Sequence, residues 1–186
     1  MVPIGLLWLP IVLSAVFVFI ASSVIHMVLG YHASDLRQVP DEQGVQDALR
    51  PFNLTPGDYG LPKPASAAAM RDPAFVEKRQ KGPVAFITVI PSGVPSMGSA
   101  LGLWFVYAIV VSACAAYVAG RALGVVTTYP QVFRFAGTTA FLAYSMSLPQ
   151  NSIWWGRNWS MTAKSMFDGL IYGALVGGTF GWLWPR

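Results

Sequence analysis

Long apolar stretches separated by polar ones dominate the pattern of hydrophobic positions along this chain. Four of these stretches reach the roughly 20 residues that a helix needs to cross a lipid bilayer. They predict membrane-spanning helices at residues 4–30, 97–120, 131–149 and 163–184. We therefore expect an all-α fold, in which a four-helix transmembrane bundle makes up a single membrane domain over residues 1–186.

The last predicted helix carries a small residue at every fourth position. Because an α-helix has about 3.6 residues per turn, these residues lie on one face, which we call the glycine stripe. The glycine stripe consists of Ser165, Gly169, Gly173, Gly177 and Gly181. Glycine costs about 1 kcal/mol in a water-exposed helix, whereas in lipid it lets two helix backbones approach closely. The stripe predicts close packing against a helix of this bundle, against a foreign subunit, or against both.

The second predicted span repeats this spacing of small residues. The positions concerned are Ala108, Ser112, Ala116 and Gly120. A compact bundle needs one close-packing face on each helix, so we expect this face also to contact a neighbouring helix.

Residues 32–96 form one long polar segment between the first two spans. Because it is rich in proline and poor in large apolar side chains, we expect a mostly irregular loop and not an independent domain. Short helices are predicted after Pro40 and from Pro73 to Lys81. The apolar run from Val84 to Ile90 is too short to span a bilayer, and we expect it to lie against the membrane surface or a partner protein.

Composition supports a membrane protein, because 54% of the 186 residues are hydrophobic and only 11% are charged, against about 25% charged in soluble domains. The net charge of +4 comes from scattered residues and predicts no binding to nucleic acid. Nine Lys and Arg residues lie on the side of the long loop and three on the other side. This asymmetry predicts a cytoplasmic loop and periplasmic termini in a bacterial inner membrane.

Polar residues inside a span are costly, and each is a candidate for function. His26 lies near the end of the first span, with the small residue Ser22 one turn earlier. That spacing suits axial ligation of a haem or chlorin through Nε2. The only other histidine, His32, is expected at a different level, which disfavours a bis-histidine haem but leaves a five-coordinate chlorin or a shared site open. The alternative is a structural hydrogen bond from His26 to Ser22 or to a neighbouring carbonyl.

Lys164 and Asp168 are four residues apart at the start of the last span, so their side chains can meet. We expect an interfacial ion pair that fixes the depth of the helix; the alternative is a contact with a proton or a cation. The sequence contains no phosphate-binding glycine loop and no HExxH, CxxC or GxSxG motif. It therefore predicts no catalytic residue and no site for a bare metal ion.

Three segments carry a resemblance to known sequences. The first span ends in SSVIHMVLGYH, the loop contains PDE…ALRPF, and the last span ends in GTFGWLWPR. With these features the chain resembles uncharacterised bacterial four-span inner-membrane proteins, and the resemblance implies no activity and no catalytic residue. We expect a non-catalytic accessory subunit at the edge of a larger respiratory or photosynthetic assembly, in contact with lipid and other membrane subunits. A small self-contained transporter or channel and an intramembrane enzyme are the alternatives.

Overall fold

The computed structural model describes residues 1–185 and is mostly helical. The chain divides into two units, which we call the helical unit and the loop unit. The helical unit comprises Met1–Leu36 and Ser96–Arg186, and the loop unit comprises Arg37–Pro95. The predicted limits of the loop, 32–96, therefore lie close to those of the loop unit.

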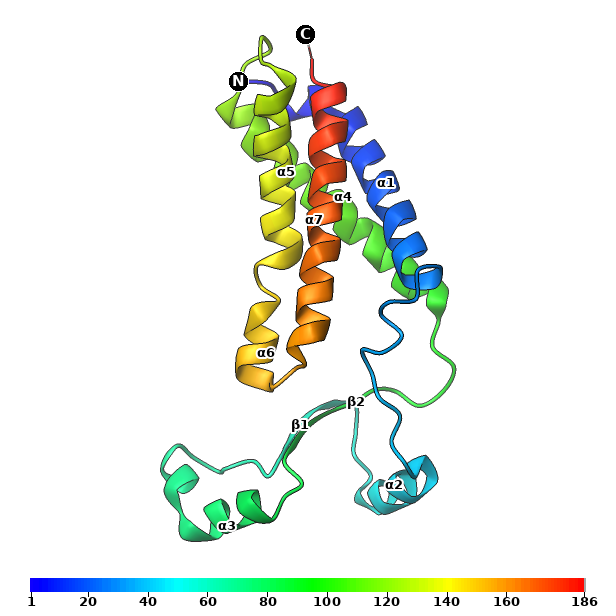
Figure 1. Ribbon diagram of the computed structural model, residues 1–186, viewed down its shortest axis with the longest axis vertical. Helices are drawn as coiled ribbons and strands as arrows, with labels where there is room; N and C mark the ends of the chain where they lie inside the picture. Colours follow the sequence, from blue (N-terminus) through cyan, green and yellow to red (C-terminus); the bar gives the residue numbers. More distant parts are fainter. Residues whose placement is uncertain (186) are drawn as a thin grey trace. The chain divides into compact units, whose positions relative to one another are not determined.

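Four long helices make up most of the helical unit (Figure 1). They are α1 (Trp8–Met27), α4 (Met97–Ala122), α5 (Tyr129–Ser145) and α7 (Trp159–Trp182), and a short helix α6 (Pro149–Trp155) precedes α7. Helix α5 packs along α7, α4 packs against α1 and α5, and α1 also contacts α7. The core between them is built from small and branched side chains such as Ala15, Ala108, Ala136 and Val176, all fully buried.

Capping residues explain where the helices differ from the predicted limits. Helix α7 begins at Trp159, before the predicted residue 163, because the Asn158 side chain accepts a hydrogen bond from the Ser160 backbone N–H. Helix α5 begins at Tyr129. It ends at Ser145, short of the predicted residue 149, and the chain turns there before α6 begins at Pro149.

Two helices are long and apolar enough to cross a membrane, Ile4–Met27 and Met97–Ala122. Only 28% of the most apolar window of each is buried, whereas a core helix of a soluble protein would be mostly buried. Helix α5 has 17 residues, or about 25 Å. Helix α7 has 24 residues but contains Lys164, Asp168 and many glycines, which lower its hydropathy.

Both ends of the described chain, residues 1 and 185, lie near the connection between α4 and α5 (Figure 1). Near the N-terminus, the backbone N–H of Val2 donates to the Gly120 carbonyl oxygen over 2.7 Å. Near the C-terminus, the Trp184 indole N–H donates to the Gly124 carbonyl oxygen over 3.0 Å. The two termini therefore lie at the same end of the helical unit.

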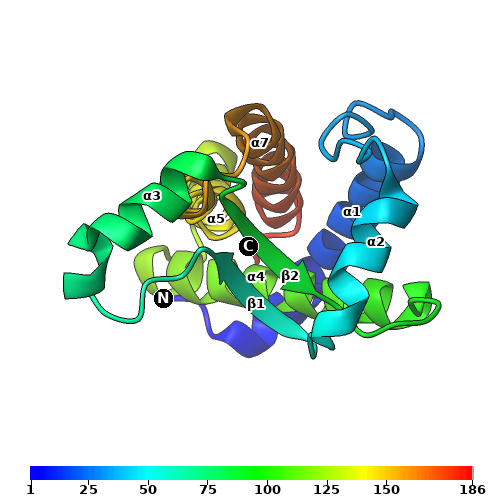
Figure 2. The ribbon, with the colours of Figure 1, turned by 90° about the horizontal axis from the view of Figure 1, so that it is seen from below.

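The glycine stripe packs against α5, as the views in Figures 1 and 2 also indicate. A Cβ atom added at Gly173 would lie 2.9 Å from the Gly137 carbonyl oxygen, and one at Gly177 would lie 2.8 Å from the Phe133 carbonyl oxygen. These distances leave no room for a side chain. At Gly173 and Gly177 the stripe therefore packs within the protein's own bundle, as the first interpretation expects.

The rest of the two predicted small-residue faces is accounted for in the same way. Gly169 lies against Ser145, Gly181 lies against the ring of Tyr129, and Ser165 is half-buried. On α4, the face is buried at every predicted position: Ala108, Ser112, Ala116 and Gly120. A Cβ atom at Gly120 would lie 2.7 Å from the Val2 carbonyl oxygen. The absence of a side chain at Gly120 therefore lets the N-terminal backbone pack against α4.

The loop unit is more regular than expected. It contains helices α2 (Glu42–Leu49) and α3 (Pro73–Lys81) and strands β1 (Gly57–Leu61) and β2 (Ala85–Val89). The strands pair antiparallel, with Tyr59 opposite Ile87 (Figure 2). The run Val84 to Ile90 thus forms a strand, because its β-branched residues favour pairing with β1. None of the residues 37–95 is buried, so this unit has no core of its own.

Candidate functional site

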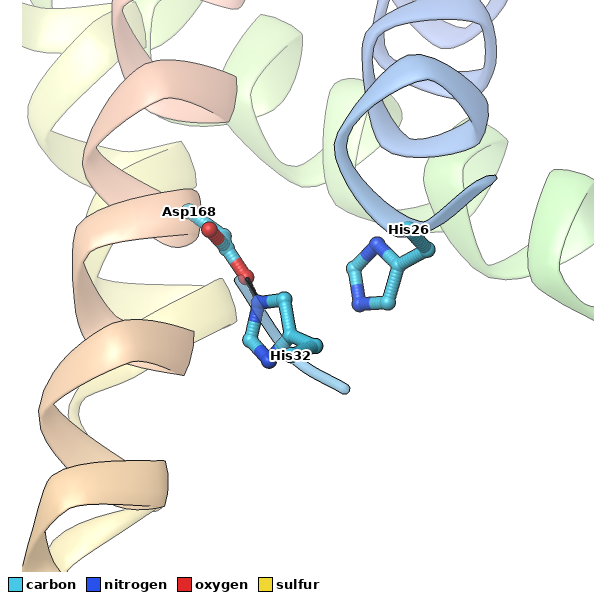
Figure 3. A group of neighbouring side chains, drawn as sticks. All are labelled: His26, His32 and Asp168. Atoms are coloured by element: carbon cyan, nitrogen blue, oxygen red, sulfur yellow. Dashed lines mark hydrogen bonds and ion pairs between the residues drawn. The ribbon is translucent and has the colours of Figure 1, made fainter. Parts of the chain in front are cut away.

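Polar side chains from two separate parts of the helical unit meet at the end of α1 (Figure 3). His26 lies in the last turn of α1, His32 in the turn that follows it, and Asp168 in α7. Each offers one ligating atom, and these three atoms lie within 4.8 Å of one another. We call these three residues the His–His–Asp cluster.

His32 is the centre of this cluster. Its Nδ1 lies 2.6 Å from Oδ2 of Asp35, and its Nε2 lies 2.8 Å from Oδ2 of Asp168. The imidazole also stacks on that of His26, with ring centroids 4.6 Å apart and planes inclined by 5°. The prediction that the two histidines lie at different levels is therefore wrong, because the chain turns back after Met27 and brings His32 beside His26.

Asp168 is almost fully buried, with 3% of its surface exposed. Its second oxygen, Oδ1, accepts a hydrogen bond from the Tyr31 hydroxyl. Burial, together with this hydrogen bond, raises the pKa of Tyr31 to about 12, so the phenol stays protonated and remains a donor. Tyr31 thereby fixes the orientation of the carboxylate.

Lys164 does not form the predicted ion pair with Asp168. Its ammonium donates to Oδ1 of Asp35 over 2.8 Å, to the Tyr31 carbonyl oxygen over 2.7 Å and to the Ser34 hydroxyl over 3.0 Å. The reason is that the turn after α1 folds over α7 and places a second carboxylate beside the lysine. Lys164 thus ties this turn to α7, while Asp168 is engaged by Tyr31 and His32.

The carboxylate of Asp35 lies between two donors. Hydrogen bonds hold the pKa of Asp35 below its ordinary value, and the bond from Lys164 has a larger effect than the bond from His32. The side chain of Asp35 is 8% exposed. A buried carboxylate with two donors is a stable hydrogen-bond acceptor, and it fixes the orientation of the His32 ring.

His26 makes the structural hydrogen bond that was the alternative to cofactor binding, from Nδ1 to the Ser22 carbonyl oxygen over 3.0 Å. The Ser22 side chain does not leave an open space, because it is buried and its hydroxyl accepts the Trp104 indole N–H over 2.8 Å. A haem or chlorin metal already has four ring nitrogens and leaves only axial positions. Three protein atoms within 4.8 Å of one another, at His26, His32 and Asp168, suit a bare ion better.

Several residues of this site escaped the sequence analysis. His32 and Asp35 were not paired with anything, although their spacing of three residues brings two polar groups together in a turn. Tyr31 gave no signal at all, because tyrosines are common near membrane interfaces.

Comparison with known proteins supplies no further guide: no family model, no curated protein and no solved structure matches the chain.

Proposed function

We propose that this protein is a non-catalytic accessory subunit of a larger integral-membrane assembly, of a respiratory or photosynthetic type. The observation that carries the proposal is the exposure of the two apolar helices Ile4–Met27 and Met97–Ala122, whose most apolar windows are only 28% buried. Surfaces of that size and polarity need lipid or the helices of another subunit around them.

The distribution of ionisable groups supports a structural role over a transport role. A transporter or proton pathway places polar groups near the middle of the membrane or in a series across it. Here the ionisable side chains between α1 and α7 gather in one network at the end of α1, and they are engaged with one another. The buried faces of α1 and α4 consist mainly of alanine, serine and valine, which carry no ionisable group.

We further propose that all four long helices cross a bacterial inner membrane, with the loop unit in the cytoplasm and both termini in the periplasm. The excess of Lys and Arg on the loop side supports this orientation. Helices α5 and α7 would cross as a tightly packed pair in which glycines replace larger apolar side chains.

Native mass spectrometry after extraction in a gentle detergent tests the proposed role. An accessory subunit is expected to appear with stoichiometric companion subunits. A homogeneous particle of this chain alone, able to move a solute across liposomal membranes, would support a transporter instead and overturn the proposal.

Reporter fusions at residue 65 and at the C-terminus test the proposed orientation. They are expected to report opposite compartments, and finding both on one side would contradict the orientation.

A further inference from the structure

The His–His–Asp cluster has the composition and spacing of a metal site. Metal–ligand distances for imidazole nitrogen and carboxylate oxygen are about 2.0–2.2 Å, so two ligands of one ion lie up to about 4 Å apart. The three ligating atoms of His26, His32 and Asp168 lie within 4.8 Å of one another. The widest pair would have to close by only about 1 Å, and His26 is exposed, so that a small change in its side-chain torsions meets no packing barrier from a surrounding core.

A layer of outer hydrogen bonds already orients each of the three ligands. His26 donates through Nδ1 to the Ser22 carbonyl oxygen, which leaves its Nε2 for a metal. His32 is held through Nδ1 by the Asp35 carboxylate, and Asp168 is held through Oδ1 by the Tyr31 hydroxyl. Carboxylate or carbonyl partners on the far nitrogen of the histidine ligands are the usual arrangement in protein metal sites.

The contact between His32 and Asp168 also calls for a cation. When Nδ1 of His32 donates its proton to Asp35, the neutral ring has a lone pair on Nε2. That lone pair faces the Asp168 carboxylate oxygen over 2.8 Å, and two acceptors at this distance repel each other. Either a proton lies between them, or the two atoms separate to about 3.3 Å and share a metal ion. The second imidazole, His26, stacked at 4.6 Å, is the reason to favour a metal, since a proton needs no third ligand.

The ligand types restrict the choice of ion. Two imidazoles and one carboxylate suit zinc and the other divalent first-row metals, whereas Mg²⁺ and Ca²⁺ prefer oxygen ligands throughout. We propose that His26, His32 and Asp168 bind one divalent first-row transition-metal ion, which fastens the turn after α1 to α7. This inference is independent of the proposed accessory role.

Zinc titration of the full-length chain tests the proposal. The protein is produced without a polyhistidine tag, purified in detergent, stripped with a chelator and titrated with ZnCl₂ by calorimetry. The chain contains only two histidines and one cysteine, so few other strong ligands compete. We expect one Zn²⁺ per chain. Replacing Zn²⁺ with Co²⁺ is expected to give visible absorption bands of a site with nitrogen and oxygen ligands.

Four variants locate the site. His26→Ala and Asp168→Asn each remove a ligand and are expected to abolish measurable binding of Zn²⁺. Asp35→Asn leaves all three ligands in place but weakens the orientation of His32, so the affinity should fall about 10- to 100-fold. Cys114→Ser, a change in an exposed residue of α4, serves as the matched control and should leave the titration unchanged.

Circular dichroism and gel filtration establish that each variant is folded. His26 is exposed, so His26→Ala is expected to fold even where Asp168→Asn does not, and it can decide the question alone. The proposal is overturned if the folded wild-type chain binds no Zn²⁺, or if the folded His26→Ala variant binds it as tightly as the wild type. In either case the contact between His32 and Asp168 is a proton-bridged pair.

Discussion

His32 and Asp168 are 136 residues apart in the chain, yet Nε2 of the histidine lies 2.8 Å from Oδ2 of the aspartate. This contact joins the turn after α1 to α7. Because Asp168 is almost fully buried, the contact has little competition from solvent. It is one of the contacts that join the first and last helices of the bundle, and with His26 it forms the candidate metal centre.

The close approach of α5 and α7 predicts that a large side chain in the glycine stripe will destabilise the protein. A Cβ atom at Gly173 would already lie 2.9 Å from both the Gly137 carbonyl oxygen and the Cβ atom of Phe141. Gly173→Leu should therefore push the two helices apart, and overpacking of this kind costs about 1–3 kcal/mol or more. Thermal unfolding in detergent, followed by circular dichroism, measures the effect.

Ala174→Leu provides the matched control, because Ala174 is the next residue of the same helix and is exposed. Its unfolding temperature should stay close to that of the wild type. Val176 cannot serve as the control, although it lies off the glycine stripe, because its side chain is fully buried. Equal unfolding temperatures for Gly173→Leu and Ala174→Leu would show that α5 does not pack on the stripe.

Much of the fold follows from local patterns. The apolar stretches predicted the four long helices within a few residues at each end, and the short helix predicted from Pro73 to Lys81 is α3. The four-residue spacing of glycine in α7 predicted a close helix contact but not its partner. That partner is α5, and the packed bundle brings its Gly137 opposite Gly173 and Gly177.

The site could be predicted only in part, because its contacts join distant parts of the chain. A spacing of four residues suggested that Lys164 pairs with Asp168, and such pairs are worth only about 0.2–0.5 kcal/mol. In the folded chain Lys164 donates a hydrogen bond to the Asp35 carboxylate. The Asp168 carboxylate instead contacts Tyr31 and His32. No local rule could choose between these partners, since the choice depends on how the turn after α1 folds.

Two buried serines should respond in opposite ways to removal of the hydroxyl group. Ser22 accepts a hydrogen bond from the Trp104 indole and donates one to the Phe19 carbonyl oxygen, so it joins α1 to α4. The Ser112 hydroxyl, in the described part of the chain, is buried without a hydrogen-bond partner. Hydrogen bonds between membrane helices average about 0.6 kcal/mol, so Ser22→Ala should lower stability by about that amount or more.

Ser112→Ala should leave stability unchanged or raise it, because it removes a buried polar atom that gains nothing in the folded state. Unfolding of both variants in mixed detergent micelles measures the difference. A larger loss in Ser112→Ala than in Ser22→Ala would mean that Ser112 has a partner and that the contact between Trp104 and Ser22 contributes little.

The partner of Lys164 can be identified by double-mutant cycles. One cycle combines Lys164→Met with Asp35→Asn, and the other combines Lys164→Met with Asp168→Asn. Because Lys164 donates directly to Asp35 over 2.8 Å, the first pair should show a coupling energy within the range of about 0.5–3 kcal/mol found for residues in contact. The second pair is connected only through His32 and the turn, so its coupling energy should be the smaller of the two.

Chemical unfolding of the chelator-treated chain gives both coupling energies under the same conditions, without a contribution from bound metal. A larger coupling to Asp168 than to Asp35 would restore the ion pair expected from sequence spacing and would mean that the turn after α1 does not fold onto α7.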